Sequence, residues 1–298
     1  MKALAVYLVA VLFSLSAVQA DDVTPSHVYQ VANTAVRELQ EVLSAKKIKR
    51  QHLDLEASPR RPRHVLQKAR EVFVKLQNIR LLLNLPPIEV PPLSVGRIAP
   101  VDVKIQTNRI LDAVRELYQT SGKKTLVDLV RFRSGKTPTD VYAQMAQISS
   151  MLDELQETAV KPSDVFRFSV TVKQVLEEIY KIKMNGALPS YEIAPVTGKS
   201  PRDVFQLGRV LHAKLEVLEA KHGYNIDGGV GEVKAKAGRV TPSDVLDLMN
   251  IILADVNAMK LPAGVQHVTQ LPAYEGRKTP SDVFQEISKS IYIVDALL

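Results

Sequence analysis

The sequence predicts an all-α protein, an eight-helix repeat made of two duplicated four-helix halves with long, partly extended connections. Three observations support this prediction. A Pro-x-Asp-Val segment occurs in eight related copies, each copy is followed by apolar residues at helical spacing, and the intervals between copies fall into two sets of four. We expect residues 21–160 to form the first half and residues 161–298 the second, after a signal peptide at residues 1–20.

Each copy of the repeat has the chemistry of a helix start. A Ser or Thr in front of the proline suits the N-cap, and proline suits the first helical position, where no N–H is needed. The Asp that follows can accept a bond from the N-cap and favours the positive end of the helix dipole. His27 and His64 replace it in the first two copies, and we interpret them as drifted caps rather than as a metal or proton site. The predicted helices begin at Pro25, Pro62, Pro100, Pro138, Pro162, Pro201, Pro242 and Pro280.

Apolar residues after each proline recur at steps of three and four, which is the period of an amphipathic helix. Val141 is followed in this way by Met145, Ile148, Leu152 and Leu155. Each helix is therefore expected to bury one apolar stripe.

The intervals between prolines predict the arrangement of the helices. Successive prolines are 37 to 41 residues apart, except for Pro138 and Pro162, which are 24 apart. A long connection can run back along its helix and leave consecutive helices parallel, whereas the short junction makes the fourth and fifth helices antiparallel. We therefore expect two halves of opposite sense related by a pseudo-two-fold axis, with a continuous solenoid as the alternative. Matched residues, such as Lys75 with Lys214 and Asp153 with Asp295, favour duplication.

The N-terminal residues indicate export. Lys2 precedes an apolar run that ends at Leu15, and Val18 and Ala20 place small residues before a cleavage site. We expect a periplasmic or extracellular protein with no integral membrane span after cleavage. The chain has no cysteine, so disulfides and thiolate metal sites are excluded.

Positive charge is concentrated between Lys46 and Arg70, where nine basic residues are opposed only by Asp54 and Glu56. Basic residues at the start of the second predicted helix oppose its dipole, which the other copies do not do. The window is either a solvated, degenerate repeat or a surface that binds an anionic partner. The candidate residues for that partner are Lys46, Lys47, Lys49, Arg50, Arg60, Arg61, Arg63, His64, Lys68 and Arg70.

No catalytic or cofactor motif was found. Gly135-Lys136-Thr137 resembles the end of a phosphate-binding loop, but the first glycine of that motif is replaced by Val130. The glycine-rich segment 227–231 lacks dinucleotide-binding spacing and is interpreted as a flexible turn. The six histidines show no zinc-protease spacing. We therefore expect no enzyme activity, no cofactor and no metal.

Two functions remain as hypotheses. The first is an exported, non-enzymatic helical-repeat interaction or scaffold protein, whose partner is a protein or an anionic cell-envelope polymer bound through the basic window; nucleic acid is less favoured. The alternative is a periplasmic small-ligand-binding or sensory module with its ligand between the two halves, for which the equivalent residues Asn108 and Asn250 are the candidates. The sequence leaves the oligomeric state open.

Overall fold

The computed structural model describes residues 23–49, 58–93, 95–122, 125–156, 160–188 and 193–298. This part of the chain folds into eight α-helices with no strand, which confirms the all-α prediction, and every helix begins at a predicted proline. The predicted signal peptide and Arg50 lie outside the described residues. The helices are α1 (Pro25–Ala45), α2 (Pro62–Leu82), α3 (Pro100–Thr120), α4 (Pro138–Gln156), α5 (Pro162–Lys183), α6 (Pro201–His222), α7 (Pro242–Ala263) and α8 (Pro280–Leu297).

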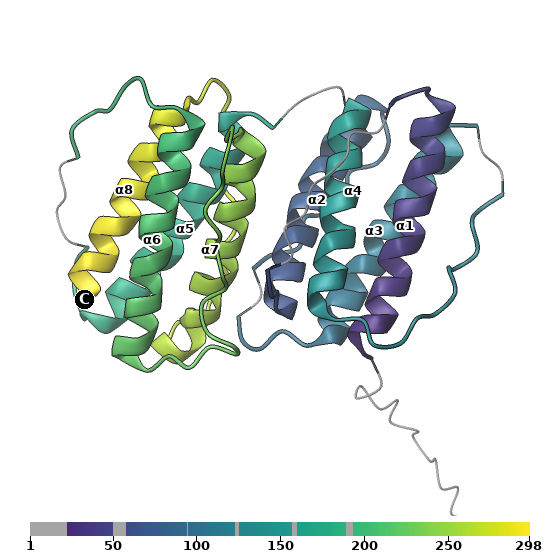
Figure 1. Ribbon diagram of the computed structural model, residues 1–298. Coiled ribbons are helices and arrows are strands. Elements are labelled where there is room, and N and C mark those ends of the chain that lie inside the picture. Colours follow the sequence, from purple (N-terminus) through teal and green to yellow (C-terminus); the bar gives the residue numbers. More distant parts are fainter. Residues whose placement is uncertain (1–22, 50–57, 94, 123–124, 157–159, 189–192) are drawn as a thin grey trace, which may run out of the picture.

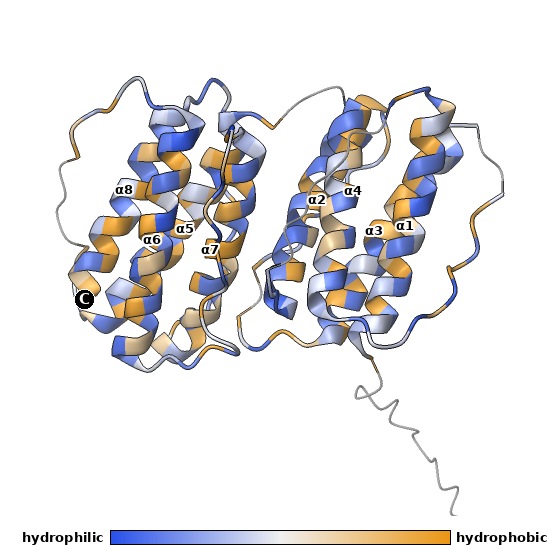
Figure 2. Cartoon of the chain, viewed as in Figure 1, coloured by the Kyte–Doolittle hydropathy of each residue, from blue (hydrophilic) through white to orange (hydrophobic). Residues whose placement is uncertain are grey.

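The helices form two four-helix bundles that lie side by side (Figure 1). In the first bundle, α1 and α2 each pack against both α3 and α4. In the second bundle, α5 and α6 each pack against both α7 and α8. The pairing of helices is therefore the same in the two bundles, and each helix turns an apolar stripe inward (Figure 2).

All four helices of a bundle run in the same direction. The four prolines and four valines of the repeat in the first bundle line one small apolar recess, and their counterparts line another in the second bundle. The helix N-termini therefore meet at one end, and the long connections return the chain along the bundle. Val28, Val65, Val103 and Val141 close this end of the first core, and each is at most 3% exposed.

The predicted acceptor at the third helical position is present in all eight copies, whereas the N-cap hydroxyl accepts from the helix backbone in four, those of Thr137, Ser200, Thr241 and Thr279. In six copies the aspartate accepts a hydrogen bond from the backbone N–H of the N-cap, as Asp203 does from Ser200 at 2.8 Å. In the other two, Nδ1 of His27 accepts from Thr24 and Nδ1 of His64 accepts from Arg61. Because four parallel helices bring four positive dipole ends together, these acceptors also reduce the electrostatic cost of the arrangement.

Contacts between neighbouring helix starts also recur. Ser26 accepts a bond from the backbone of Lys136 at 3.0 Å in the first bundle, and Ser163 accepts from Lys278 at 3.1 Å in the second. These pairs occupy corresponding places in the repeat. Duplication of the halves itself stays a prediction.

The two bundles have opposite senses, because α1 begins and α8 ends at the same side of the molecule (Figure 1). The contacts between the bundles do not bear out the predicted pseudo-two-fold axis, however. The bundles meet through α2 and α7, the second helix of one set and the third of the other, and the described residues show no matching interface between α3 and α6. Three of the α2 side chains in this interface, His64, Lys68 and Glu71, are replaced at the equivalent positions of α6 by Asp203, Leu207 and Val210.

None of the described helices has a stretch of apolar residues sufficient to cross a bilayer.

Candidate functional site

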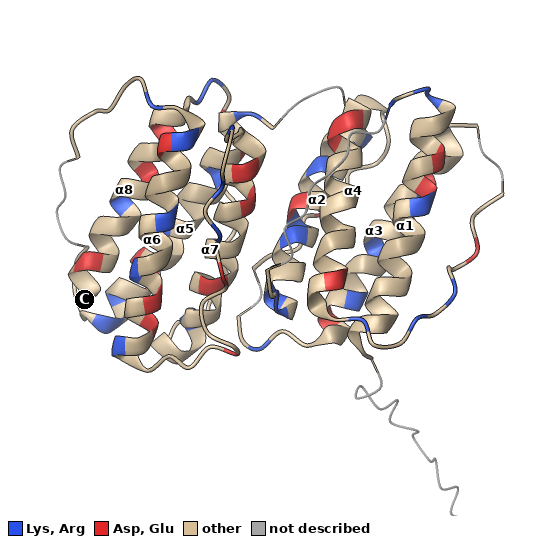
Figure 3. Cartoon of the chain, viewed as in Figure 1, with Lys and Arg blue, Asp and Glu red and all other residues tan. Residues whose placement is uncertain are grey.

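The boundary between the bundles contains a buried polar network. Acidic residues of α7 and basic residues of α2 lie along this boundary (Figure 3). His64 occupies its centre because its cap position turns the ring toward α7. Its Nδ1 accepts from the N–H of Arg61 at 2.9 Å, so its proton is on Nε2, which donates to Asp255 Oδ1 at 2.9 Å. Burial lowers the pKa of His64, against the opposing attraction of Asp255, and the ring stays neutral.

Asp255 joins three segments of the chain. Besides His64, its carboxylate accepts from Arg63 Nε at 2.8 Å and from the N–H of Gly231 at 2.8 Å. Burial raises the pKa of Asp255, but His64, Arg63 and the Gly231 N–H together bring it below the usual value. The carboxylate therefore stays ionised although its side chain is fully buried.

Arg63 anchors the glycine-rich segment that follows α6. Its Nη1 and Nη2 donate to the carbonyls of Asp227 and Gly229, both at 2.5 Å. The segment can approach α2 closely because it has glycines there: a Cβ at Gly231 would lie 2.7 Å from His64 Nε2. The predicted flexible turn is thus a docked segment of the interface.

A second group of buried charges surrounds Glu71. Its carboxylate accepts from Lys68 at 2.8 Å and Ser149 at 2.5 Å, and it lies 3.2 Å from the ammonium of Lys75. Asn250 of α7 also donates to Glu71, at 2.5 Å. Burial raises the pKa of Glu71, but the two lysines and their hydrogen bonds bring it down to about 2. The network therefore spans both bundles.

The candidate residues of the basic window are not brought together on one surface. Lys46, Lys47 and Lys49 are exposed at the end of α1, and Arg61 is exposed at the start of α2. Arg60 is half-buried, donates to the carbonyl of Glu232 and lies over the ring of Tyr142. Four others are buried in the interface, contrary to the expected solvated surface, because α7 and the connections cover that face of α2: Arg63, His64, Lys68 and Arg70.

Asn108 and Asn250 also lie apart. Asn108 is exposed on α3, whereas Asn250 is 1% exposed in the interface and accepts from Gln67 at 3.0 Å. Asn250 is thus part of the network between the bundles, and it does not share a site with Asn108.

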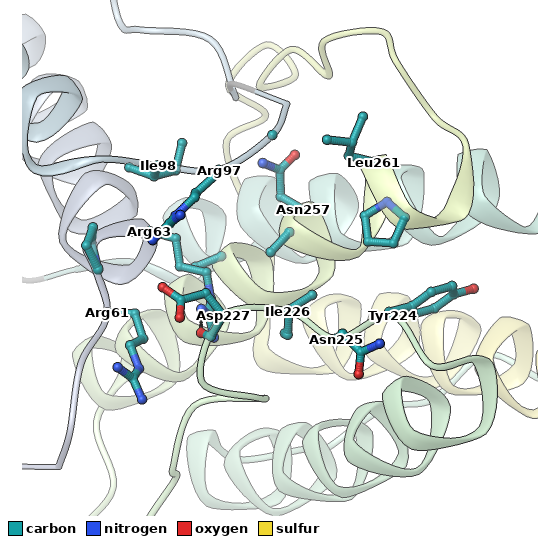
Figure 4. Close-up of a pocket in the computed structure, with 15 residues that line it drawn as sticks. Arg61, Arg63, Arg97, Ile98, Tyr224, Asn225, Ile226, Asp227, Asn257 and Leu261 are labelled. Atoms are coloured by element: carbon teal, nitrogen blue, oxygen red, sulfur yellow. Dashed lines mark hydrogen bonds between the residues drawn. The ribbon is translucent and has the colours of Figure 1, made fainter.

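A cleft of about 460 Å³ opens beside the polar network, between the start of α2 and the end of α7 (Figure 4). This volume is within the range of about 300 to 1,000 Å³ that is typical of small-molecule sites. Its walls come from both bundles: the start of α2, the connection before α3, the segment after α6 and the last two turns of α7. The lining residues are Arg61, Pro62, Arg63, Gly96, Arg97, Ile98, Tyr224, Asn225, Ile226, Asp227, Ala254, Asn257, Ala258, Leu261 and Pro262.

Two arginines of the cleft differ from the buried ones. Arg61 and Arg97 are exposed, and neither side chain has an ion pair or a hydrogen bond with another described residue. Arg61 packs against Gly228, where a Cβ would lie 2.1 Å from its Nε. Because this glycine has a φ of +75°, the segment turns here and leaves the guanidinium room at the rim of the cleft.

Sequence reasoning identified Arg61 and Arg63 but missed the rest of the cleft. Arg97 and residues 224–227 lie in connections, where a single sequence gives no periodic signal. The glycines at 228 and 231 were the available signal, since glycine marks close approach of the backbone to another group.

Comparisons with protein-family models, with curated proteins and with solved structures give no match to this chain.

Proposed function

We propose that this chain is an exported, non-enzymatic binding protein that holds a small anionic ligand in the cleft between its two bundles. The observation that carries the proposal is the pair of exposed arginines, Arg61 and Arg97, that line the cleft without a carboxylate partner among the described residues. Export rests on the N-terminal sequence, and the non-enzymatic role rests on the lack of a catalytic motif in the sequence.

The charge of the cleft favours an anion. Arg63 is matched by the buried Asp255, so it adds little net charge. The remaining charged groups in the lining are Arg61, Arg97 and the carboxylate of Asp227, and they leave the cleft positive. A guanidinium can donate two parallel bonds to a carboxylate or phosphate, each worth about 1.5–3 kcal/mol.

The position of the cleft agrees with the second hypothesis from the sequence, in which the ligand lies between the halves. A site with walls from two bodies buries a ligand more completely than a site on one helix face, and small-molecule sites occur preferentially at such boundaries. The network around Asp255 would hold the walls in place before the ligand arrives, which reduces the entropic cost of binding.

Isothermal titration of residues 21–298 with benzoate and with inorganic phosphate at low ionic strength tests the proposal. The double variant Arg61→Gln/Arg97→Gln is expected to bind at least one of these anions about tenfold or more weakly. The matched control is Arg131→Gln/Arg133→Gln, which removes the same charge from exposed positions on the connection after α3. Equal binding by the two double variants, or no binding by the wild type, contradicts the proposal.

The C-terminal end of the first bundle favours a second function. Lys46, Lys47 and Lys49 are exposed there, and Leu81 and Leu82 at the end of the parallel helix α2 are 59% and 73% exposed. Exposed leucines beside lysines suit the surface of an anionic membrane. This amphipathic end would make the chain an envelope-surface interaction protein.

Co-sedimentation with vesicles separates this function from ligand binding. Binding to phosphatidylglycerol-containing vesicles, but not to phosphatidylcholine vesicles, is expected, together with its loss in Lys46→Gln/Lys47→Gln/Lys49→Gln. The control triple variant, Lys181→Gln/Lys221→Gln/Lys234→Gln, removes the same charge from the second bundle. An equal loss of vesicle binding in the two triple variants would show nonspecific electrostatic attraction and overturn this second function.

A further inference from the structure

The two ends of the cleft differ in chemistry. In Figure 4, Arg61 and Arg63 lie at one side and Leu261 and Tyr224 at the other, while Arg97 lies above. Between these ends the lining is mostly apolar, supplied by Ile98, Ile226, Ala254, Ala258 and Pro262. A ligand that fills the cleft would therefore meet guanidinium groups at one end and hydrocarbon at the other.

The apolar end continues out of the cleft. Leu261 is 49% exposed although it lines a concave site, and its Cδ2 lies 3.9 Å from where a Cβ of Gly96 would be. Just after the end of α7, the Cγ2 of Ile182 of α5 lies 3.3 Å from the corresponding point at Gly264, and Ile182 is itself 53% exposed. Exposed apolar side chains that extend a pocket wall are a feature of binding grooves for apolar groups.

Asp227 limits the charge of the ligand. Its carboxylate is in the same lining as the two unpaired guanidinium groups, and the structure gives it no ion pair within the described residues. A singly charged head can bind the guanidinium groups with little repulsion from Asp227, whereas each further negative charge is repelled. The cleft is thus better matched to a carboxylate than to a phosphate dianion.

We infer that the ligand is an amphiphilic monocarboxylic acid, with its carboxylate at the arginine-rich end of the cleft and its apolar body along Ala258, Leu261 and Pro262. This inference rests on the proposed function, since it assigns the ligand class of the same cleft. The planar guanidinium matches the two oxygens of a carboxylate. Burial of the apolar body against the end of α7 supplies affinity that a head group alone lacks.

The test is a calorimetric titration of residues 21–298 with acetate, hexanoate, decanoate and decanol. The affinity is expected to rise from acetate to decanoate, by up to about fourfold for each methylene that becomes buried. Decanol, which lacks the charge, is expected to bind more weakly than decanoate. Equal affinity for acetate and decanoate in a protein that still binds benzoate would overturn this inference and leave the proposed function standing.

Three variants assign the two ends of the ligand. Leu261→Asn should flatten the dependence on chain length, while the control Val210→Asn, at a 47% exposed position on α6, should not. Asp227→Asn should raise the affinity for inorganic phosphate more than the affinity for decanoate. Arg61→Gln/Arg97→Gln should weaken decanoate and leave decanol unchanged. Equal binding of decanol and decanoate by the wild type would show an apolar site without anion recognition, and it would overturn both proposals.

Discussion

Nε2 of His64 lies 2.9 Å from Oδ1 of Asp255, and the two residues belong to different bundles. The same imidazole caps its own helix through Nδ1, so one side chain both starts α2 and fixes α2 against α7. The position of His64 only caps the helix in the other copies of the repeat, whereas in the second copy it also links the two bundles.

Removal of Asp255 should strongly weaken the contact between α2 and α7. Asp255→Ala leaves Arg63 and the N–H of Gly231 buried without their acceptor, so the free energy of unfolding in urea is expected to fall by about 3–5 kcal/mol. Asp295→Ala is the matched control, because it breaks a more exposed pair with Lys214 and should cost at most about 1 kcal/mol. Similar losses in the two variants would mean that the interface contributes little.

The neutral state of His64 predicts a dependence of stability on pH. Burial lowers its pKa below the ordinary 6.5, so the unfolded chain binds more protons than the folded chain as pH falls below 6.5, and stability is lost in that direction. His64→Asn should reduce this loss between pH 7 and pH 5. Burial raises the pKa of Asp153 to about 6, so this residue changes the stability in the opposite sense, and it does so equally in the wild type and in His64→Asn. The difference between the urea midpoints of the two proteins therefore measures the contribution of His64 alone. A loss of the same size in the variant would contradict the assignment.

The sequence predicted the helices better than the interface. All eight starts were identifiable because the cap, proline and acceptor are local, and the parallel course within each bundle followed from the lengths of the connections. The basic window was interpreted as one surface because runs of charge are usually solvated. Its partners across the interface, Asp247 and Asp255, are about 180 to 190 residues away in the chain, and a single sequence does not show such pairing.

Gly231 should resist substitution. In Gly231→Ala the new Cβ would lie 2.7 Å from Nε2 of the fully buried His64 ring, which cannot move away, so a loss of about 1–3 kcal/mol is expected. Gly276→Ala provides a control, since its nearest neighbour is at 4.0 Å and its unfolding free energy should change by less than about 0.5 kcal/mol. Thermal denaturation of both variants beside the wild type measures the difference, and an unchanged melting temperature for Gly231→Ala would contradict the close approach.

The repeat also predicts a stabilising substitution. His27→Asp restores the acceptor that six other copies use and places a negative charge at the positive end of α1, so it should add about 0.3–1 kcal/mol at neutral pH. His27→Ala removes the acceptor and should cost about 1 kcal/mol. Chemical unfolding at low and high salt measures both. If His27→Asp stabilises the protein equally at low and at high salt, the helix dipole is not the source of the stabilisation.

The site was harder to predict than the fold for a physical reason. Arg61 stood out because it breaks the cap pattern, but Arg97 and Asp227 lie in connections whose positions depend on how the bundles pack. Only Gly228 and Gly231 marked the segment that approaches α2. Asn108 and Asn250 are equivalent in the predicted duplication, yet the interface uses α7 and leaves the α3 face exposed, so equivalence in sequence did not mean a shared site.

The central claim is that Arg61 and Arg97 hold an anionic ligand between the bundles, and their side-chain Nε–Hε signals in a ¹H–¹⁵N spectrum test it most directly. Titration with decanoate should shift these two signals together, with one dissociation constant, while the signals of Arg131 and Arg133 stay in place. Signals of Arg61 and Arg97 that remain unmoved at saturating decanoate, or that move no more than those of Arg131 and Arg133, would contradict the claim.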